Sequence, residues 1–126
     1  MTKTARLFLG AGGTLAFLAV ALGAFGAHAL KGRIPPEMLA VWRTASEYHF
    51  YHALGLLAVG LAAAKQPDSR LLRWSGWTML AGIGLFSGSL YALALTGERW
   101  LGSITPVGGT AFLVAWALFI AAVLKQ

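Results

Sequence analysis

The chain has 126 residues, of which 58% are hydrophobic and only 11% are charged. This composition excludes an ordinary soluble domain, because too few polar side chains remain to cover its surface. Ten lysines and arginines against four acids give a net charge of +6, but they stand singly between apolar segments, so we expect anionic lipid headgroups and not nucleic acid as their partners. The absence of cysteine excludes disulfides and thiolate metal sites.

The first apolar segment covers residues 7–30 and contains no charged residue. At about 1.5 Å per residue it is long enough to cross a hydrocarbon core of about 30 Å. A secretory signal peptide is the alternative, since basic residues precede the segment and Ala27-His28-Ala29 resembles a cleavage site. The apolar part is too long for a signal peptide, so we predict a transmembrane helix.

A second helix is predicted to begin at the two prolines of residues 35–36, because proline fits the first helical turn and Glu37 complements the helix dipole there. It begins as a short interfacial segment and becomes the second span over residues 44–64. The polar turn at residues 65–68 ends it.

The third and fourth predicted spans cover residues 71–95 and 104–124, with a short polar loop between them. Trp74 and Trp77 stand at the beginning of the third span, where amphipathic rings favour the membrane interface. Connections this short make neighbouring helices run antiparallel. Residues 1–126 are therefore predicted to form a single all-α domain, an integral membrane four-helix bundle with both termini on one side.

Basic residues near the helix ends predict the orientation of the bundle, since they are more frequent on the cytoplasmic side. The side with the termini and the middle loop carries Lys3, Arg6, Lys65, Arg70, Arg73 and Lys125, and the other side carries Lys31, Arg33, Arg43 and Arg99. We therefore predict that both termini are cytoplasmic.

Small residues one helical turn apart let helices approach closely in lipid. Gly84 and Gly88 form one such GxxxG pair, and Gly23 with Ala27 forms a looser version. We predict that these four positions lie at helix contacts. Several small-residue faces on so short a chain also favour a homo-oligomer.

Polar side chains gather in one half of the predicted bundle, above all in residues 42–57. Counted by helical rise from the end of the second span, His52 lies about 18 Å deep, His49 about 22 Å and Glu47 about 25 Å. These depths fall within a hydrocarbon core of about 30 Å. The same half also receives His28, Ser87, Ser89, Tyr91, Thr105 and Thr110.

Helical phase, at about 100° per residue, divides the second span into two faces. The face expected to lie against other helices carries Thr44, Glu47, Tyr48, His49, Tyr51, His52 and Gly55. The opposite face, expected to meet lipid, carries Phe50, Leu54, Leu57 and Leu61. The candidate site drawn from the polar half consists of His28, Glu47, Tyr48, His49, His52, Ser89 and Tyr91.

Two interpretations of this candidate site compete. Ionisable residues inside a membrane are expensive and often functional. In the interpretation we favour, neutral histidines hydrogen-bond across helices and fasten the bundle, and Glu47 pairs with Arg43 one helical turn earlier. The alternative is a site that binds a metal, haem or small ligand, or that conducts protons or a small solute. No nucleophile with a base and an orienting group can be assembled, so we expect no enzyme activity and predict no cofactor.

Four segments carry a further signal: Gly-Ala-Phe-Gly-Ala-His-Ala-Leu-Lys from Gly23, Thr-Ala-Ser-Glu-Tyr-His-Phe-Tyr-His-Ala-Leu from Thr44, Gly-Ser-Leu-Tyr from Gly88, and Ile-Thr-Pro-Val-Gly-Gly from Ile104. Together they resemble the small multi-pass DUF-423 family, which is similar to the eukaryotic transmembrane protein 256 group. The resemblance extends over nearly the whole chain. It implies a four-helix integral membrane protein, largely bacterial, without an established biochemical activity. We therefore expect a non-enzymatic protein of the bacterial inner membrane with a role in membrane or envelope integrity.

Overall fold

The computed structural model describes residues 1–125, and every regular element in them is helical. The elements are α1 (Lys3–Phe25), the π-helical turn η1 (Gly26–Leu30), α2 (Pro36–Lys65), α3 (Arg70–Gly82), the π-helical turn η2 (Ile83–Ser87), α4 (Gly88–Thr96), the 3₁₀ turn η3 (Arg99–Ser103) and α5 (Thr105–Leu124). Because η1 continues α1 and η2 joins α3 to α4 without a break, the chain forms four long helical rods. The all-α prediction is confirmed.

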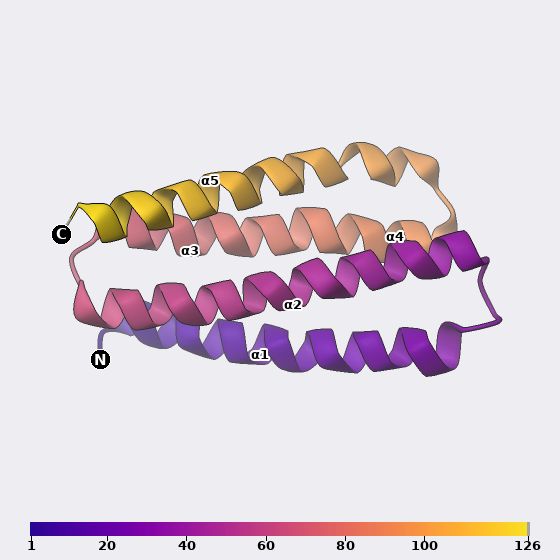
Figure 1. The fold of residues 1–126 in the computed structure, drawn as a ribbon, viewed down its shortest axis with the longest axis horizontal. Coiled ribbons are helices and arrows are strands. Elements are labelled where there is room, and N and C mark those ends of the chain that lie inside the picture. Colours follow the sequence, from indigo (N-terminus) through magenta and orange to yellow (C-terminus); the bar gives the residue numbers. More distant parts are fainter. Residues whose placement is uncertain (126) are drawn as a thin grey trace.

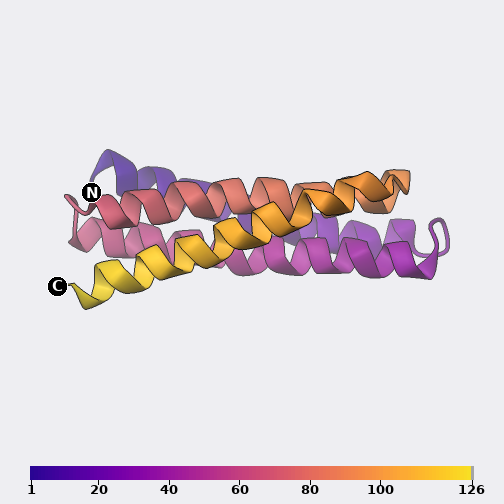
Figure 2. The ribbon, with the colours of Figure 1, turned by 90° about the horizontal axis from the view of Figure 1, so that it is seen from above.

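The four rods lie side by side, and the chain passes from one end of the molecule to the other with each rod (Figure 1). Helix α1 packs mainly on α2, and α3 packs mainly on α5. Helix α2 also packs on α3, η2 and α4, and so links the two pairs. Both termini lie at the same end of the molecule in both views (Figures 1 and 2).

Local sequence signals explain where the rods begin and end. The Thr2 hydroxyl accepts a hydrogen bond from the backbone N–H of Ala5 at 3.2 Å and so caps α1. Helix α2 begins at Pro36, as the sequence predicted, and continues without a break through the expected interfacial segment. Gly97 ends α4 with a φ of 73°, a left-handed conformation that glycine adopts most readily.

Three of the helical stretches in the described residues are long and apolar enough to cross a membrane: Lys3–Leu30, Arg70–Thr96 and Arg99–Leu124. The first, third and fourth predicted spans therefore coincide with helices that are able to cross a membrane by their length and composition. Helix α2 is also long, with 30 residues, but the polar residues in its first half lower its hydropathy. The second span over residues 44–64 stays a prediction.

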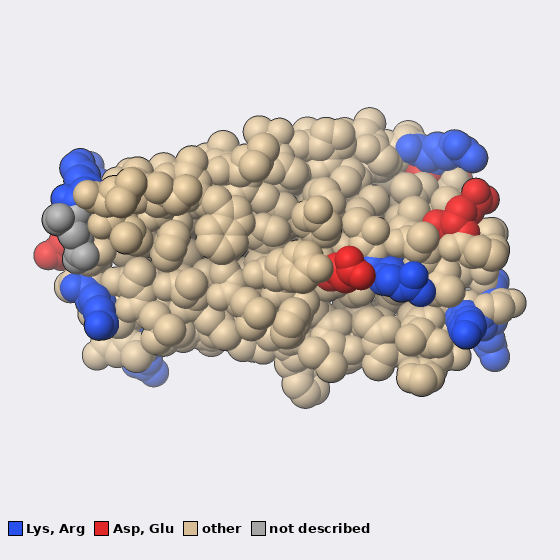
Figure 3. All heavy atoms as spheres, in the orientation of Figure 1, with Lys and Arg blue, Asp and Glu red and all other residues tan. Residues whose placement is uncertain are grey.

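Apolar side chains pack in the middle of the four rods and also cover their outside. The central cluster consists of Phe8, Leu56, Val59, Met79, Ile83, Phe112 and Ala115. On the face shown in Figure 3, the surface between the two ends is almost free of charge, and Lys, Arg, Asp and Glu gather at the ends. One acidic and one basic patch interrupt this surface, along the course of α2 (Figures 1 and 3).

The predicted packing glycines are corrected by the structure. Gly84 and Gly88 are exposed, and a Cβ added at either would meet no atom within 4 Å. Ala27 is exposed, and a Cβ at Gly23 would make only an ordinary contact, 3.7 Å from the Ser46 hydroxyl. The GxxxG spacing failed because it crosses the wider π-helical turn of η2, and because spacing alone does not show which face meets a neighbour.

The close helix approaches occur at other glycines. A Cβ at Gly108 on α5 would lie 2.3 Å from the backbone nitrogen of Phe86 in η2, and a Cβ at Gly12 on α1 would lie 2.9 Å from the carbonyl oxygen of Ala53 on α2. Gly26 is covered by the indole of Trp42, whose nearest ring atom would be 2.4 Å from a Cβ. These contacts hold α5 against η2 and α1 against α2 at backbone distance.

Candidate functional site

Helix α2 carries most of the candidate residues, and its faces differ from those that helical phase predicted. His49, His52 and Gly55 are buried, but Glu47, Tyr48 and Tyr51 are exposed. On the face predicted to meet lipid, Leu54 and Leu61 are exposed, while Phe50 and Leu57 are half-buried. The physical reason is that α1 covers one side of α2 while α3, η2 and α4 cover another, so that only a narrow strip of α2 is left uncovered.

His52 makes a complete set of hydrogen bonds. Its Nδ1 lies 2.8 Å from the carbonyl oxygen of Tyr48, and because a carbonyl only accepts, this nitrogen carries the proton. Its Nε2 lies 3.1 Å from the indole nitrogen of Trp116 on α5, and because an indole only donates, Nε2 accepts. His52 is therefore a neutral imidazole in the Nδ1–H tautomer, with neither nitrogen free.

Aromatic packing holds the His52 ring in this orientation. The ring stacks on Phe112 of α5 with a centroid separation of 3.5 Å and an interplanar angle of 8°. Trp116 approaches the same imidazole at an angle of 57°. The ring is only 6% exposed, so His52 links α2 to α5 through both a hydrogen bond and a buried stack.

His49 lies one turn before His52 and is bonded on one side only. Its Nδ1 lies 2.9 Å from the hydroxyl oxygen of Tyr91 on α4, and either group can donate. The ring also lies near the backbone of Leu15 on α1, but its buried Nε2 makes no hydrogen bond within the described residues. His49 is thus the one buried histidine with spare hydrogen-bonding capacity.

Trp42 extends the contact between His49 and Tyr91 to the first helix. Its ring lies against that of Tyr91, with centroids 4.6 Å apart, and its indole N–H donates to the carbonyl oxygen of Leu22 at 2.8 Å. Because Gly26 has no side chain, the indole can lie directly on the backbone of η1. Side chains of α2 therefore tie α1 and α4 together through one buried cluster.

Serine hydroxyls make the remaining polar contacts between helices. Ser75 donates to the carbonyl oxygen of Ala115 at 2.7 Å, and Ser87 donates to that of Ala45 at 2.8 Å. Ser89, a predicted candidate, lies 2.7 Å from the hydroxyl oxygen of Thr105 on α5. These bonds join α3 to α5, η2 to α2, and α4 to α5.

The structure does not bring the seven candidates to one point. His28 in η1 is exposed, and so are Glu47 and Tyr48. His49 meets Tyr91, and Ser89 meets Thr105. Within residues 1–125, no three His, Asp or Glu side chains are placed to hold a metal ion.

Sequence reasoning missed several residues that complete these contacts, namely Trp42, Ser75 and Trp116. Each is a hydrogen-bond donor inside a long helix, and such a donor needs a partner when it is away from water. A search for isolated donors within apolar segments would have found them. Depth along the helix places Ser87 in the polar half, although the candidate site does not include it.

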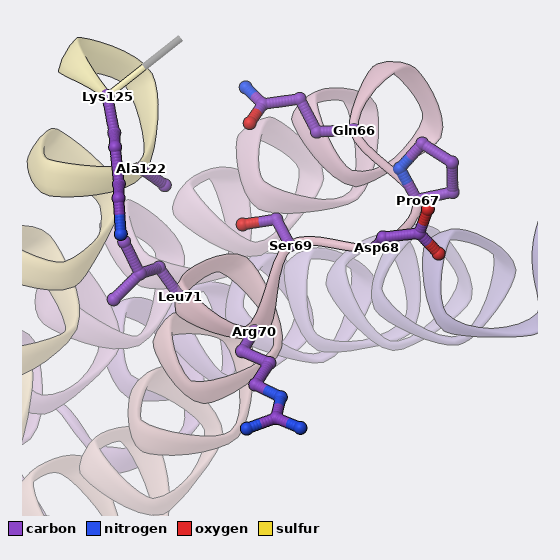
Figure 4. A pocket seen from close by; sticks show the side chains of 8 residues that line it. All are labelled: Gln66, Pro67, Asp68, Ser69, Arg70, Leu71, Ala122 and Lys125. Atoms are coloured by element: carbon purple, nitrogen blue, oxygen red, sulfur yellow. The ribbon is translucent and has the colours of Figure 1, made fainter.

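A separate hollow of about 570 Å³ lies at the end of the molecule that holds the termini. It is lined by Gln66, Pro67, Asp68, Ser69, Arg70, Leu71, Ala122 and Lys125. The charged ends of Asp68, Arg70 and Lys125 point in different directions (Figure 4). None of the predicted site residues lines it, so it is distinct from the buried contacts.

Comparison with known proteins places these features in a wider group. The family model described as a protein of unknown function (DUF423) matches residues 22–109. The UPF0382 membrane protein YwdK of Bacillus subtilis is 49% identical over 120 residues, which cover 95% of this chain and 98% of the relative. UPF0382 membrane proteins of Staphylococcus epidermidis and Staphylococcus aureus are 44% and 45% identical over the same share of this chain and 97% of their own lengths. No solved structure matches the chain.

Proposed function

The chain belongs to the DUF423 family of bacterial membrane proteins, as the four sequence segments predicted, and from this premise we propose that it is a non-enzymatic, homo-oligomeric protein that supports membrane or envelope integrity. In this proposal its four rods form an antiparallel transmembrane bundle in the inner (cell) membrane. The relatives are named as membrane proteins without a stated activity, so the role must be argued from the molecule itself.

The observation that carries this proposal is the use made of the buried polar side chains. The buried polar side chains form hydrogen bonds with side chains of other helices or with backbone carbonyl groups; they are Trp42, His52, Ser75, Ser87 and Ser89. In lipid, where apolar burial does not drive helices together, such bonds and close packing are what hold a bundle in one arrangement. In this proposal the polar half predicted from sequence fastens the rods, and Ser75 does the same in the other half of the molecule.

The placement in the membrane rests on length and charge. The rod from Lys3 to Leu30 has 28 residues, which is about 42 Å and exceeds a hydrocarbon core of about 30 Å. The end with the termini carries six basic residues, whereas the other end carries Lys31, Arg33 and Arg99, with Arg43 on the exposed side of α2. This difference supports cytoplasmic termini. Tagging each terminus and testing its access to a membrane-impermeant reagent will check this orientation.

The proposed role is tested by deleting the gene in a bacterium that carries it and challenging the cells with osmotic shock and detergent. We expect lower survival, restored by the wild-type chain and not by Gly108→Ala, which disrupts the contact of α5 with η2. The matched control Gly84→Ala, at an exposed glycine, should restore survival fully. If cells that lack the gene survive every challenge as well as the parent strain, the envelope role is refuted.

A second candidate function, conduction of protons through a site at His49 and Tyr91, is favoured by one observation. The buried Nε2 of His49 has no hydrogen-bond partner in the described residues, whereas both nitrogens of His52 are occupied. Proton flux into liposomes should then be lost with His49→Phe and kept with the matched variant His52→Phe. Equal flux in both variants, or flux no greater than that of empty liposomes, would exclude this function.

A further inference from the structure

Helix α2 carries a charged pair on a surface that is otherwise apolar. Arg43 and Glu47 are both exposed and stand one helical turn apart. They are the only charged residues of the described chain that lie more than three positions inside a helix. This agrees with the acidic and basic patch on the tan surface along α2 in Figure 3.

The depth of Glu47 follows from the length of its helix. The 30 residues of α2 extend over about 45 Å, which exceeds the hydrocarbon core by about 15 Å, or ten residues. Even if all ten of these residues project out of the membrane at the Pro36 end of α2, the hydrocarbon core begins near residue 46. Glu47 therefore lies inside the hydrocarbon region, from about 2 Å below its edge in that limit to about 16 Å below it when the core begins at Pro36.

A carboxylate that faces lipid at this depth is unfavourable, and charged residues in membrane helices almost always face protein or water and pair with another charge. Long side chains such as Arg43 can reach toward the headgroups, but the short Glu47 side chain has less reach. The other charge on this strip is Arg43, one helical turn earlier, and the two form no ion pair within the described residues, so a second chain can supply the partner that each of them lacks.

We propose that a second copy of the chain covers this strip, so that Arg43 of each copy pairs with Glu47 of the other. The proposal rests on the proposed homo-oligomer and identifies its interface. Around a two-fold axis along the membrane normal, the α2 helices of the two copies run parallel. Arg43 of the first copy then faces Glu47 of the second, and Glu47 of the first faces Arg43 of the second. Arg43 and Glu47 differ in height by about 6 Å, a gap that the long arginine side chain can bridge.

The spacing of the other exposed residues suits a helix partner. Glu47, Tyr51, Leu54 and Leu61 are exposed and Ala58 is half-exposed, which gives intervals of four, three, four and three residues, and the exposed Tyr48 lies beside this line. This repeat forms a straight seam between helices that cross at a shallow angle. A strip that is self-complementary in charge and regular in spacing favours a copy of itself over a lipid or an unrelated protein.

The test uses two single charge reversals and their mixture. Arg43→Glu leaves two acids on the strip, and Glu47→Arg leaves two bases, so each variant should repel a copy of itself. A mixture of the two variants restores both pairs, because the two acids of one copy face the two bases of the other. Energy transfer between differently labelled copies in liposomes measures association, and Glu98→Arg, at an exposed position in the loop before η3, is the matched control.

We expect the wild type and Glu98→Arg to associate, each reversal alone to weaken association about tenfold or more, and the mixture to recover it. Reversals that associate like the wild type would place the oligomer interface elsewhere and overturn this inference while leaving the oligomer intact. Reversals whose mixture fails to recover, although each melts like the wild type, would also overturn it. A monomeric wild type would overturn the inference and the oligomer together, and release of an anionic lipid by Arg43→Glu from such a monomer would identify that lipid as the partner.

Discussion

Replacing His52 tests whether the buried polar side chains fasten the helices. His52→Phe keeps a flat ring for the stack on Phe112 but removes the acceptor for the Trp116 indole. Hydrogen bonds between membrane helices contribute about 0.6 kcal/mol on average and up to about 1.7 kcal/mol. We therefore expect His52→Phe to lower the free energy of unfolding by about 1 kcal/mol.

A larger loss is expected for His52→Ala, because it also removes the stack and leaves a cavity. The aromatic contact contributes about 0.5–1.5 kcal/mol, and truncation of a buried aromatic ring costs about 3–5 kcal/mol where the site cannot collapse. We expect a total loss of about 3 kcal/mol, measured by reversible unfolding in mixed detergent micelles. In every detergent, the free energy of unfolding should be lowest for His52→Ala, higher for His52→Phe and highest for the wild type.

A double-mutant cycle isolates the bond itself. His52→Phe, Trp116→Phe and the double variant should show a coupling of about 0.6–1.7 kcal/mol, because the single changes remove the same interaction. Nitrogen-15 NMR of labelled protein should show the Nδ1–H tautomer of His52, which the carbonyl of Tyr48 and the indole of Trp116 require. A coupling of zero, or the Nε2–H tautomer, would refute the assignment of His52 as a fastener.

Three further predictions concern packing and the other polar contacts. Gly108→Ala should lower the free energy of unfolding by about 1–3 kcal/mol, and with it the melting temperature, because its Cβ would meet the backbone of η2. Gly84→Ala should leave the melting temperature unchanged. Tyr91→Phe removes the hydroxyl that binds His49 and should lower the free energy of unfolding in detergent by about 0.6–1.7 kcal/mol. Combined with His52→Phe, its effect should be additive, because the two contacts are separate; a measurable coupling energy would contradict that separation. Ser75→Ala should separate α3 from α5 locally and increase hydrogen exchange there, since it removes the buried bond to the Ala115 carbonyl; unchanged exchange would contradict this role.

Much of the fold follows from the order of apolar segments and helix breakers. The start of α2 at Pro36 and the helical character of residues 44–64, 71–95 and 104–124 agree with the structure. Helix α1 begins at Lys3, four residues before the predicted apolar span, because Thr2 caps a turn that also includes basic residues. Local signals suffice here, since a helix satisfies its own backbone wherever it lies in lipid.

The candidate site was predictable only in part. Depth counted along the helix placed His49, His52, Ser89 and Tyr91 in one half of the molecule, and in the structure these side chains are buried or half-buried. Helical phase also placed Glu47 and Tyr48 toward other helices, where the structure leaves them exposed. Phase gives the direction of a side chain only relative to its own helix, so it does not show where the neighbouring helices lie.

The sequence by itself determined the class of molecule, the length of its helices and the half in which polar groups collect. These properties depend only on composition and on the position of a residue along its own helix. Only the tertiary structure decided which groups meet. The π-helical turn η2 shifts the faces of α4, which follows it, and close contacts at Gly12, Gly26 and Gly108 set the helix positions. Those positions bring Trp116 to His52 and Tyr91 to His49, and they leave Glu47 on the outside.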